Sequence, residues 1–70
     1  MRTQTDILAD YGLANIAHAG ADGSKIKIVC STGRVVLLTR VRAEKLAAEL
    51  MLAGAVREGD TLLQAIDNNE

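Results

Sequence analysis

Alternation of apolar and polar residues is sharpest in the segment 24–30 of the chain. Ile26 and Ile28 alternate there with two lysines, Lys25 and Lys27. A period of two is typical of a β-strand that buries one face and exposes the other. We therefore expect the isoleucines to face a core and the lysines to face outward.

The residues around this segment predict antiparallel neighbours for it. Ser31-Thr32-Gly33 is typical of a three-residue hairpin connection with glycine last, a position that often needs positive φ. Segment 34–39 is β-branched and apolar on both faces, as in a strand that is central or faces a partner. An earlier strand is expected over 13–19, and Ala21-Asp22-Gly23 predicts the turn that follows it.

Helical spacing replaces alternation after Thr39, which we expect to cap a helix with its hydroxyl. One apolar stripe on that helix consists of Ala43, Leu46, Ala47, Leu50 and Ala53. Gly54 is the expected residue after its end. A turn at Glu58-Gly59 then precedes a short last helix, capped by Asp60 or Thr61. Its apolar side consists of Leu62, Leu63 and Ile66.

Residues 3–11 fit two interpretations. Ile7, Leu8 and Tyr11 have helical spacing, with Thr5 as a cap and Gly12 as the end. The alternation of Thr3, Thr5 and Ile7 with polar neighbours fits an edge strand equally well. Taken together, the chain is expected to be a single α+β domain over residues 1–70. Its three- to four-stranded antiparallel sheet would carry two helices on one face and leave the other face open.

Charge is distributed unevenly, although the chain as a whole has a net charge of −1. The five basic residues of segment 24–42, which has no acidic residue, are Lys25, Lys27, Arg34, Arg40 and Arg42. This predicts a polarised surface that could contact phosphates. Tyr11 is the only aromatic residue, so the stacking platform common in single-strand binders is missing.

An enzyme is not expected, because no group of residues has catalytic spacing. His18 and Cys30 are the only histidine and cysteine, whereas a structural metal site needs about four ligands. We interpret His18 as a surface or sheet-packing residue of a strand and Cys30 as a small buried apolar residue. The glycines at 20, 23 and 33 match no phosphate-binding loop, and no cofactor is expected.

A cytoplasmic protein is the expectation from the remaining signals. No apolar run approaches the roughly 20 residues that span a bilayer, and the N-terminus has no basic region followed by an apolar one. A single cysteine cannot form an internal disulfide. For a phage-encoded chain, the compartment would be the cytoplasm of the host cell.

Asn15-Ile16-Ala17 and Gly23-Ser24-Lys25-Ile26-Lys27 resemble the first hairpin of small phage anti-CRISPR proteins that act on type I-F surveillance complexes. The resemblance implies a four-stranded antiparallel sheet with two helices on one face. It also implies a non-enzymatic inhibitor that binds a backbone subunit of the crRNA-guided complex and blocks pairing of target DNA. The positions matching two of the family's binding anchors are Ala19 and Ser31, where the anchoring side chains are not kept.

The partner-binding surface is therefore expected on the open sheet face and at the end of the hairpin. Its candidate residues are Lys25, Lys27, Val29, Ser31 and Arg34, with Arg34 near the lysines across the hairpin. A protein partner is favoured. The alternative is a small dimeric nucleic-acid-binding or regulatory protein that uses the basic hairpin. Monomer and homodimer both remain open.

Overall fold

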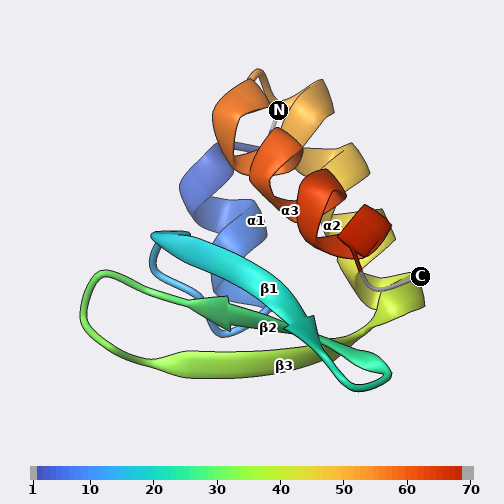
Figure 1. Cartoon of the computed structure of the whole chain (residues 1–70). Helices are drawn as coiled ribbons and strands as arrows, with labels where there is room; N and C mark the ends of the chain where they lie inside the picture. The colour runs from blue at the N-terminus through green and yellow to red at the C-terminus, as the bar shows by residue number, and fades with distance from the viewer. Residues whose placement is uncertain (1, 69–70) are drawn as a thin grey trace.

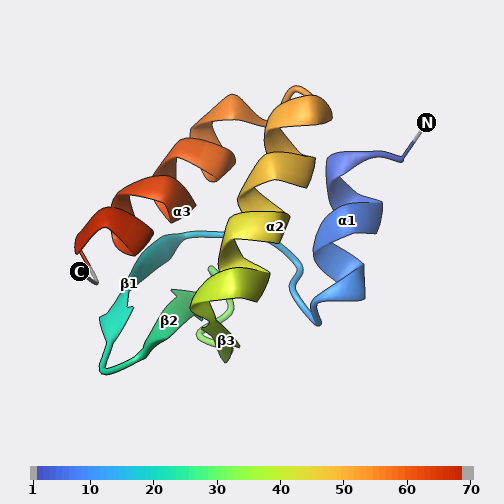
Figure 2. The ribbon, with the colours of Figure 1, turned by 90° about the vertical axis from the view of Figure 1, so that its right-hand side faces the viewer.

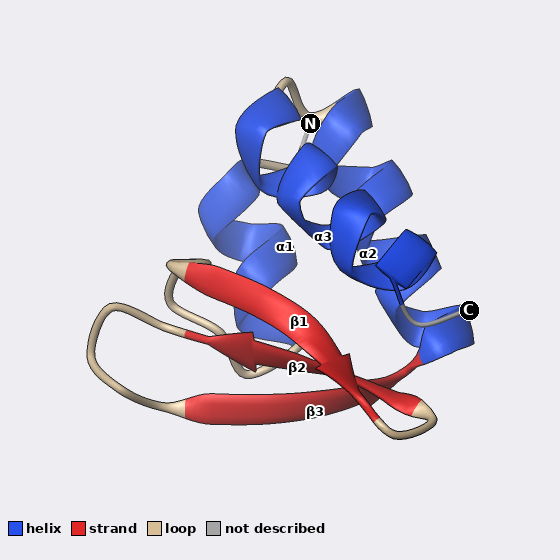
Figure 3. Cartoon of the chain, in the orientation of Figure 1, coloured by secondary structure: helices blue, strands red, loops and turns tan. Residues whose placement is uncertain are grey.

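The computed structural model describes residues 2–68 and has three helices and three strands (Figure 1). In chain order these are α1 (Gln4–Asp10), β1 (His18–Asp22), β2 (Lys25–Val29), β3 (Val35–Thr39), α2 (Arg40–Leu52) and α3 (Val56–Asn68). The helices lie on one side of the sheet, and coloring by secondary structure separates the two layers (Figure 3). The expected α+β fold with an antiparallel sheet is confirmed.

The sheet is antiparallel with strand order β1-β2-β3. A two-residue turn joins β1 to β2, and its first residue, Gly23, has φ of +62°, which favours glycine. Residues 30–34 connect β2 to β3, and the Cys30 N–H donates to the Arg34 carbonyl at 2.9 Å, which leaves the expected three-residue turn Ser31-Thr32-Gly33. Gly33, the last residue of that turn, has φ of +92° and donates its N–H to the Cys30 carbonyl at 2.9 Å.

The first strand lies later in the chain than expected. It runs from His18 to Asp22 rather than over 13–19, so Asp22 belongs to the strand and not to the turn. Alternation was weak there because three of the seven residues 13–19 are alanine. Residues 14–17 instead form an irregular approach to β1, and the Ala17 N–H donates to the Val29 carbonyl at 2.9 Å.

The ambiguous first segment is a helix. Thr3 accepts a hydrogen bond from the N–H of Asp6, whose carboxylate accepts in turn from the Thr3 N–H. The cap of this capping box, Thr3, lies two residues before the expected cap Thr5, and the helix begins at Gln4. Gly12, with φ of +75°, follows its end. The sheet therefore has three strands within residues 2–68, without the fourth that the resemblance implied, and α1 is a third helix.

The core lies between the sheet and the helices. From the middle strand, Ile26 and Ile28 are fully buried. The predicted stripe of α2 faces them, with Ala43, Leu46, Ala47 and Leu50 buried. Thr39 caps this helix by accepting from the Arg42 N–H at 3.3 Å. Cys30 is also buried, as expected for a small apolar residue.

Helix α3 begins at Val56, four to five residues before the expected caps, so the prediction of a turn at Glu58-Gly59 was wrong. Gly59 is instead a packing residue. A Cβ at this position would lie 2.9 Å from Cγ of Met51 and 3.2 Å from the carbonyl oxygen of Ala47. The missing side chain therefore lets α2 and α3 approach closely, and the two helices run side by side (Figure 2).

Candidate functional site: the open face of the sheet

Within residues 2–68, one face of the sheet has no helix over it, because the three helices of this part of the chain lie on the opposite side (Figures 1 and 2). Directly paired residues of neighbouring strands project to the same face of a sheet. The pairs of Ile26 with Leu38 and Ile28 with Val36 therefore lie on the helix side. Three further rows of paired residues form the open face: His18–Val29–Val35, Gly20–Lys27–Leu37 and Asp22–Lys25–Thr39.

The open face combines a basic centre with an apolar border. Lys25 and Lys27 are exposed on the middle strand, as the alternation predicted. Along β3, Val35 and Leu37 are 49% and 50% exposed, and Val29 lies directly opposite Val35. A surface of this composition can bind a partner that offers both apolar and acidic groups.

The β1 side of the open face is small and mixed in charge. Asp22 is paired with Lys25 in the register, and Gly20 is paired with Lys27. The missing side chain at Gly20 leaves the stem of Lys27 accessible from that side. His18 is exposed at the corner of the face, so of its two interpretations the surface residue is the one the structure shows.

The structure divides the five predicted site residues. Lys25, Lys27 and Val29 lie together on the open face. Ser31 lies in the β2–β3 connection, where its Oγ accepts from Asn15 Nδ2 at 2.7 Å and its N–H donates to Asn15 Oδ1 at 2.8 Å. These bonds hold Ser31 against the segment before β1.

Arg34 does not lie beside the lysines, so that part of the prediction was wrong. The register places it opposite Cys30, on the helix side of the sheet. Its guanidinium lies near Gly12, 3.7 Å from the position that a Cβ would occupy there. Cys30 shares the helix side with Ile26 and Ile28, and directly paired residues project to the same face, so this pairing separates Arg34 from the lysines.

The other basic residues of segment 24–42 are also separated from the open face. Arg40 is ion-paired with Glu44 at 3.3 Å within α2. Arg42 lies over the ring of Tyr11, 5.4 Å from its centroid, in cation–π contact. The segment that was basic in sequence is therefore not one basic patch in space, which weakens the expectation of nucleic-acid binding.

Sequence reasoning did not name Val35 and Leu37 as site residues. The signal for them was present, because segment 34–39 is apolar on both faces. The register supplies the missing information by placing Leu37 beside Lys27 and Val35 beside Val29. Pairing of strands cannot be read with this accuracy from one sequence.

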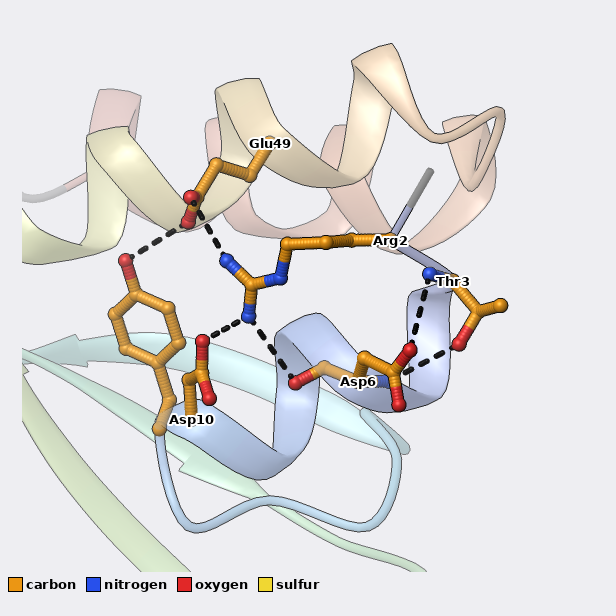
Figure 4. A network of polar contacts seen from close by, with 6 residues as sticks. Arg2, Thr3, Asp6, Asp10 and Glu49 are labelled. Atoms are coloured by element: carbon orange, nitrogen blue, oxygen red, sulfur yellow. Dashed lines mark hydrogen bonds and ion pairs between the residues drawn. The ribbon is translucent and has the colours of Figure 1, made fainter.

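A cluster of charged groups joins α1 to α2 on the helix side of the sheet (Figure 4). The guanidinium of Arg2 is ion-paired with Asp10 and lies 3.7 Å from Oε1 of Glu49. Tyr11 donates its hydroxyl to Oε2 of Glu49 at 3.1 Å. Desolvation, followed by this hydrogen bond and the carboxylate charge, raises the pKa of Tyr11. Since the acidic and basic groups pair with one another, we interpret the cluster as a tie between helices.

A polar cleft of about 320 Å³ lies at the N-terminal end of α3. Its lining includes Asn15 and Ser31, which are bonded to each other, and Arg57 from the helix. Within residues 2–68, no buried side-chain nitrogen or oxygen lacks a hydrogen-bond partner. The same residues contain no group of three or more histidine, cysteine and acidic side chains placed to hold a metal ion.

Comparison with known proteins gives no match, whether to family models, to curated proteins or to solved structures. No helix in the described part of the chain has the length and apolar character needed to cross a membrane. The open face of the sheet is therefore the candidate site on the strength of its geometry and composition.

Proposed function

We propose that the chain is a non-enzymatic binding protein that docks its open sheet face on a protein partner. The observation that supports this is the face itself: a central pair of lysines bordered by the half-exposed Val35 and Leu37, with no helix over it. Burying such a surface against apolar and acidic groups would remove exposed apolar area from water and pair the lysines.

The partner proposed is a backbone subunit of a type I-F crRNA-guided surveillance complex, with inhibition of target DNA pairing as the result. This choice rests on the resemblance of the segments 15–17 and 23–27 to small phage anti-CRISPR proteins. In the structure, Lys25 and Lys27 lie on the open face, while Asn15 lies in the segment before β1. The lysines are therefore the part of the resembling segments that a partner can reach on this face.

The test is binding of the purified surveillance complex by the wild type and by a Lys25→Glu/Lys27→Glu variant. A matched control, Lys45→Glu/Arg57→Glu, makes the same change in net charge at exposed positions on the helices. We expect the sheet variant to lose at least about tenfold in affinity while the control binds as the wild type does. Thermal melting should be nearly unchanged in both.

Two results would contradict different parts of the proposal. Equal binding by the sheet variant and the wild type would show that the lysines of the open face do not contact the partner. No binding of the complex by the wild type would remove this partner while leaving a protein-binding face possible. A gel shift with duplex DNA, lost steeply as salt is raised, would instead support the nucleic-acid alternative.

A further inference from the structure

The outer edge of β3 presents unpaired backbone groups. The Cys30 N–H donates to the Arg34 carbonyl, which marks this pair as a hydrogen-bonded one in the antiparallel ladder. Because such pairs alternate, Val36 and Leu38 direct their backbone groups toward β2. The N–H and C=O groups of Val35 and Leu37 therefore point away from the sheet, and no other strand pairs with β3 within the described residues.

The two edges of the sheet differ in protection. Edge strands usually carry charges, proline or bulges, or lie under another element, which prevents pairing with other chains. The β1 edge strand contains His18, Gly20 and Asp22, and α3 packs on it. β3 has the sequence Val-Val-Leu-Leu-Thr and contains no charge and no proline.

Side chains on β3 add an apolar border to this unprotected edge. Val35 and Leu37 project to the open face and are about half exposed. Their backbone groups and side chains are thus available on the same strand. An added strand would form hydrogen bonds with these backbone groups and would cover the side chains through cross-strand contacts.

We propose that β3 pairs antiparallel with β3 of a second copy of this chain, forming a continuous six-stranded sheet. The strand is complementary to itself, because an uncharged apolar edge matches another of the same kind, and the net charge of −1 opposes association little. A symmetric contact of this type closes after two copies. The β3–β3 contact would make the open faces of both copies one continuous surface. This inference goes beyond the function proposed for a single copy.

Charge selects the register. Centring the twofold axis on Leu37 would place Arg34 opposite Arg40 of the second copy. Centring it on Val36 pairs Val35 of each copy with Leu37 of the other copy. Arg34 and Arg40 of the two copies then do not lie opposite each other. This register also pairs the outward-facing backbone groups of Val35 and Leu37, since both residues of each pair direct them to the edge.

The dimer is expected to be weak. Pairing along five residues buries less than the roughly 800 Å² per partner of a standard interface, so we expect a dissociation constant on the order of 100 µM. Sedimentation equilibrium on the isolated chain, from about 10 µM to about 1 mM, covers this range. No partner protein is present, so the result is independent of the proposed function.

The decisive variants are Leu37→Lys and a control, Leu52→Lys. Leu52 is 86% exposed at the end of α2. The control substitution therefore removes an equally apolar side chain from a different surface. We expect Leu37→Lys to be a monomer throughout and Leu52→Lys to associate as the wild type does, with melting temperatures showing that both are folded. A monomeric wild type at about 1 mM, or loss of the dimer in Leu52→Lys alone, would overturn the proposal.

Amide hydrogen exchange provides a second measurement that does not depend on variants. The amides of Val35 and Leu37 should exchange more slowly as the concentration of the wild type rises. Those of Val36 and Leu38, which face β2, should be protected at every concentration. Exchange at Val35 and Leu37 that is independent of concentration, in a sample that does dimerise, would place the dimer contact elsewhere and overturn the proposal.

Discussion

The two faces of β2 differ in role: one packs in the core and the other forms part of the exposed surface. Ile26 and Ile28 are completely buried under the helices, whereas Lys25 and Lys27, which alternate with them in sequence, are exposed. Neighbouring residues of one five-residue strand thus have opposite environments. Substitutions on the helix face should therefore change folding, and substitutions on the open face should change binding.

The largest effect expected from this comparison is that of Ile28→Ala. Truncation of a fully buried aliphatic side chain costs about 2–5 kcal/mol, through lost burial and the cavity left behind. A chain of 70 residues has a total stability of only about 4–10 kcal/mol at typical values per residue. Urea unfolding followed by circular dichroism measures the loss. A change below about 0.5 kcal/mol would contradict the placement of Ile28 in the core.

Gly59→Ala tests the helix layer that covers this face. Alanine is the better helix former by about 1 kcal/mol, but its Cβ would lie 3.2 Å from the Ala47 carbonyl and 2.9 Å from Met51 Cγ. We expect overpacking to exceed the gain, with a net loss of about 1–2 kcal/mol in the free energy of unfolding. Met51→Ala should reduce that loss in the double variant. A stabilised Gly59→Ala would show that α2 and α3 are not in close contact here.

Tyr11→Phe tests the tie between α1 and the helix layer. Removing the hydroxyl that donates to Glu49 should lower the free energy of unfolding by about 1 kcal/mol at pH 7. The raised pKa of Tyr11 means that the folded state holds the phenol proton more tightly than the unfolded state does. This contribution is complete below pH 10, the ordinary pKa, and is lost as the pH rises above it.

Chemical denaturation at pH 7 and at pH values above 10 checks this prediction. The difference between the wild type and Tyr11→Phe should narrow on the alkaline side. A difference that widens there would mean that the hydroxyl is not bonded to Glu49 in the folded protein.

The smallest effect on folding is expected for Lys27→Glu. The side chain is exposed on the open face, and surface substitutions of this kind stay within about 0.5 kcal/mol. Denaturant midpoints of the wild type and the variant should therefore nearly coincide. A loss close to that of Ile28→Ala would end the distinction between the two faces.

Much of the fold could be predicted where neighbouring residues determine local structure. The alternation around Ile26, the cap at Thr39 and the positive φ at Gly33 all appear as expected. Predictions of element bounds were wrong where side chains were small, or where a glycine that could form a turn packs inside a helix instead. The start of β1 was placed too early among alanines, and Gly59 was interpreted as a turn because its packing role depends on Met51, which is distant in sequence.

The candidate site was only partly predictable for a related reason. Alternation placed Lys25 and Lys27 correctly, because it depends on adjacent residues alone. The positions of Arg34 and Leu37 depend on strand pairing, which sequence pattern does not specify. The register therefore separates Arg34 from the lysines and places Leu37 beside them.

The packing of α3 on β1 has a consequence for the order in which the molecule can be made. Leu62 and Ile66, the buried residues of α3, belong to the last described helix, so they are synthesised after every strand of the sheet that they help to cover. A chain in which α3 has not yet packed lacks part of the cover over the apolar side of the sheet, and exposed apolar surface and strand edges favour aggregation. Productive folding is thus expected to be completed only after α3 has emerged.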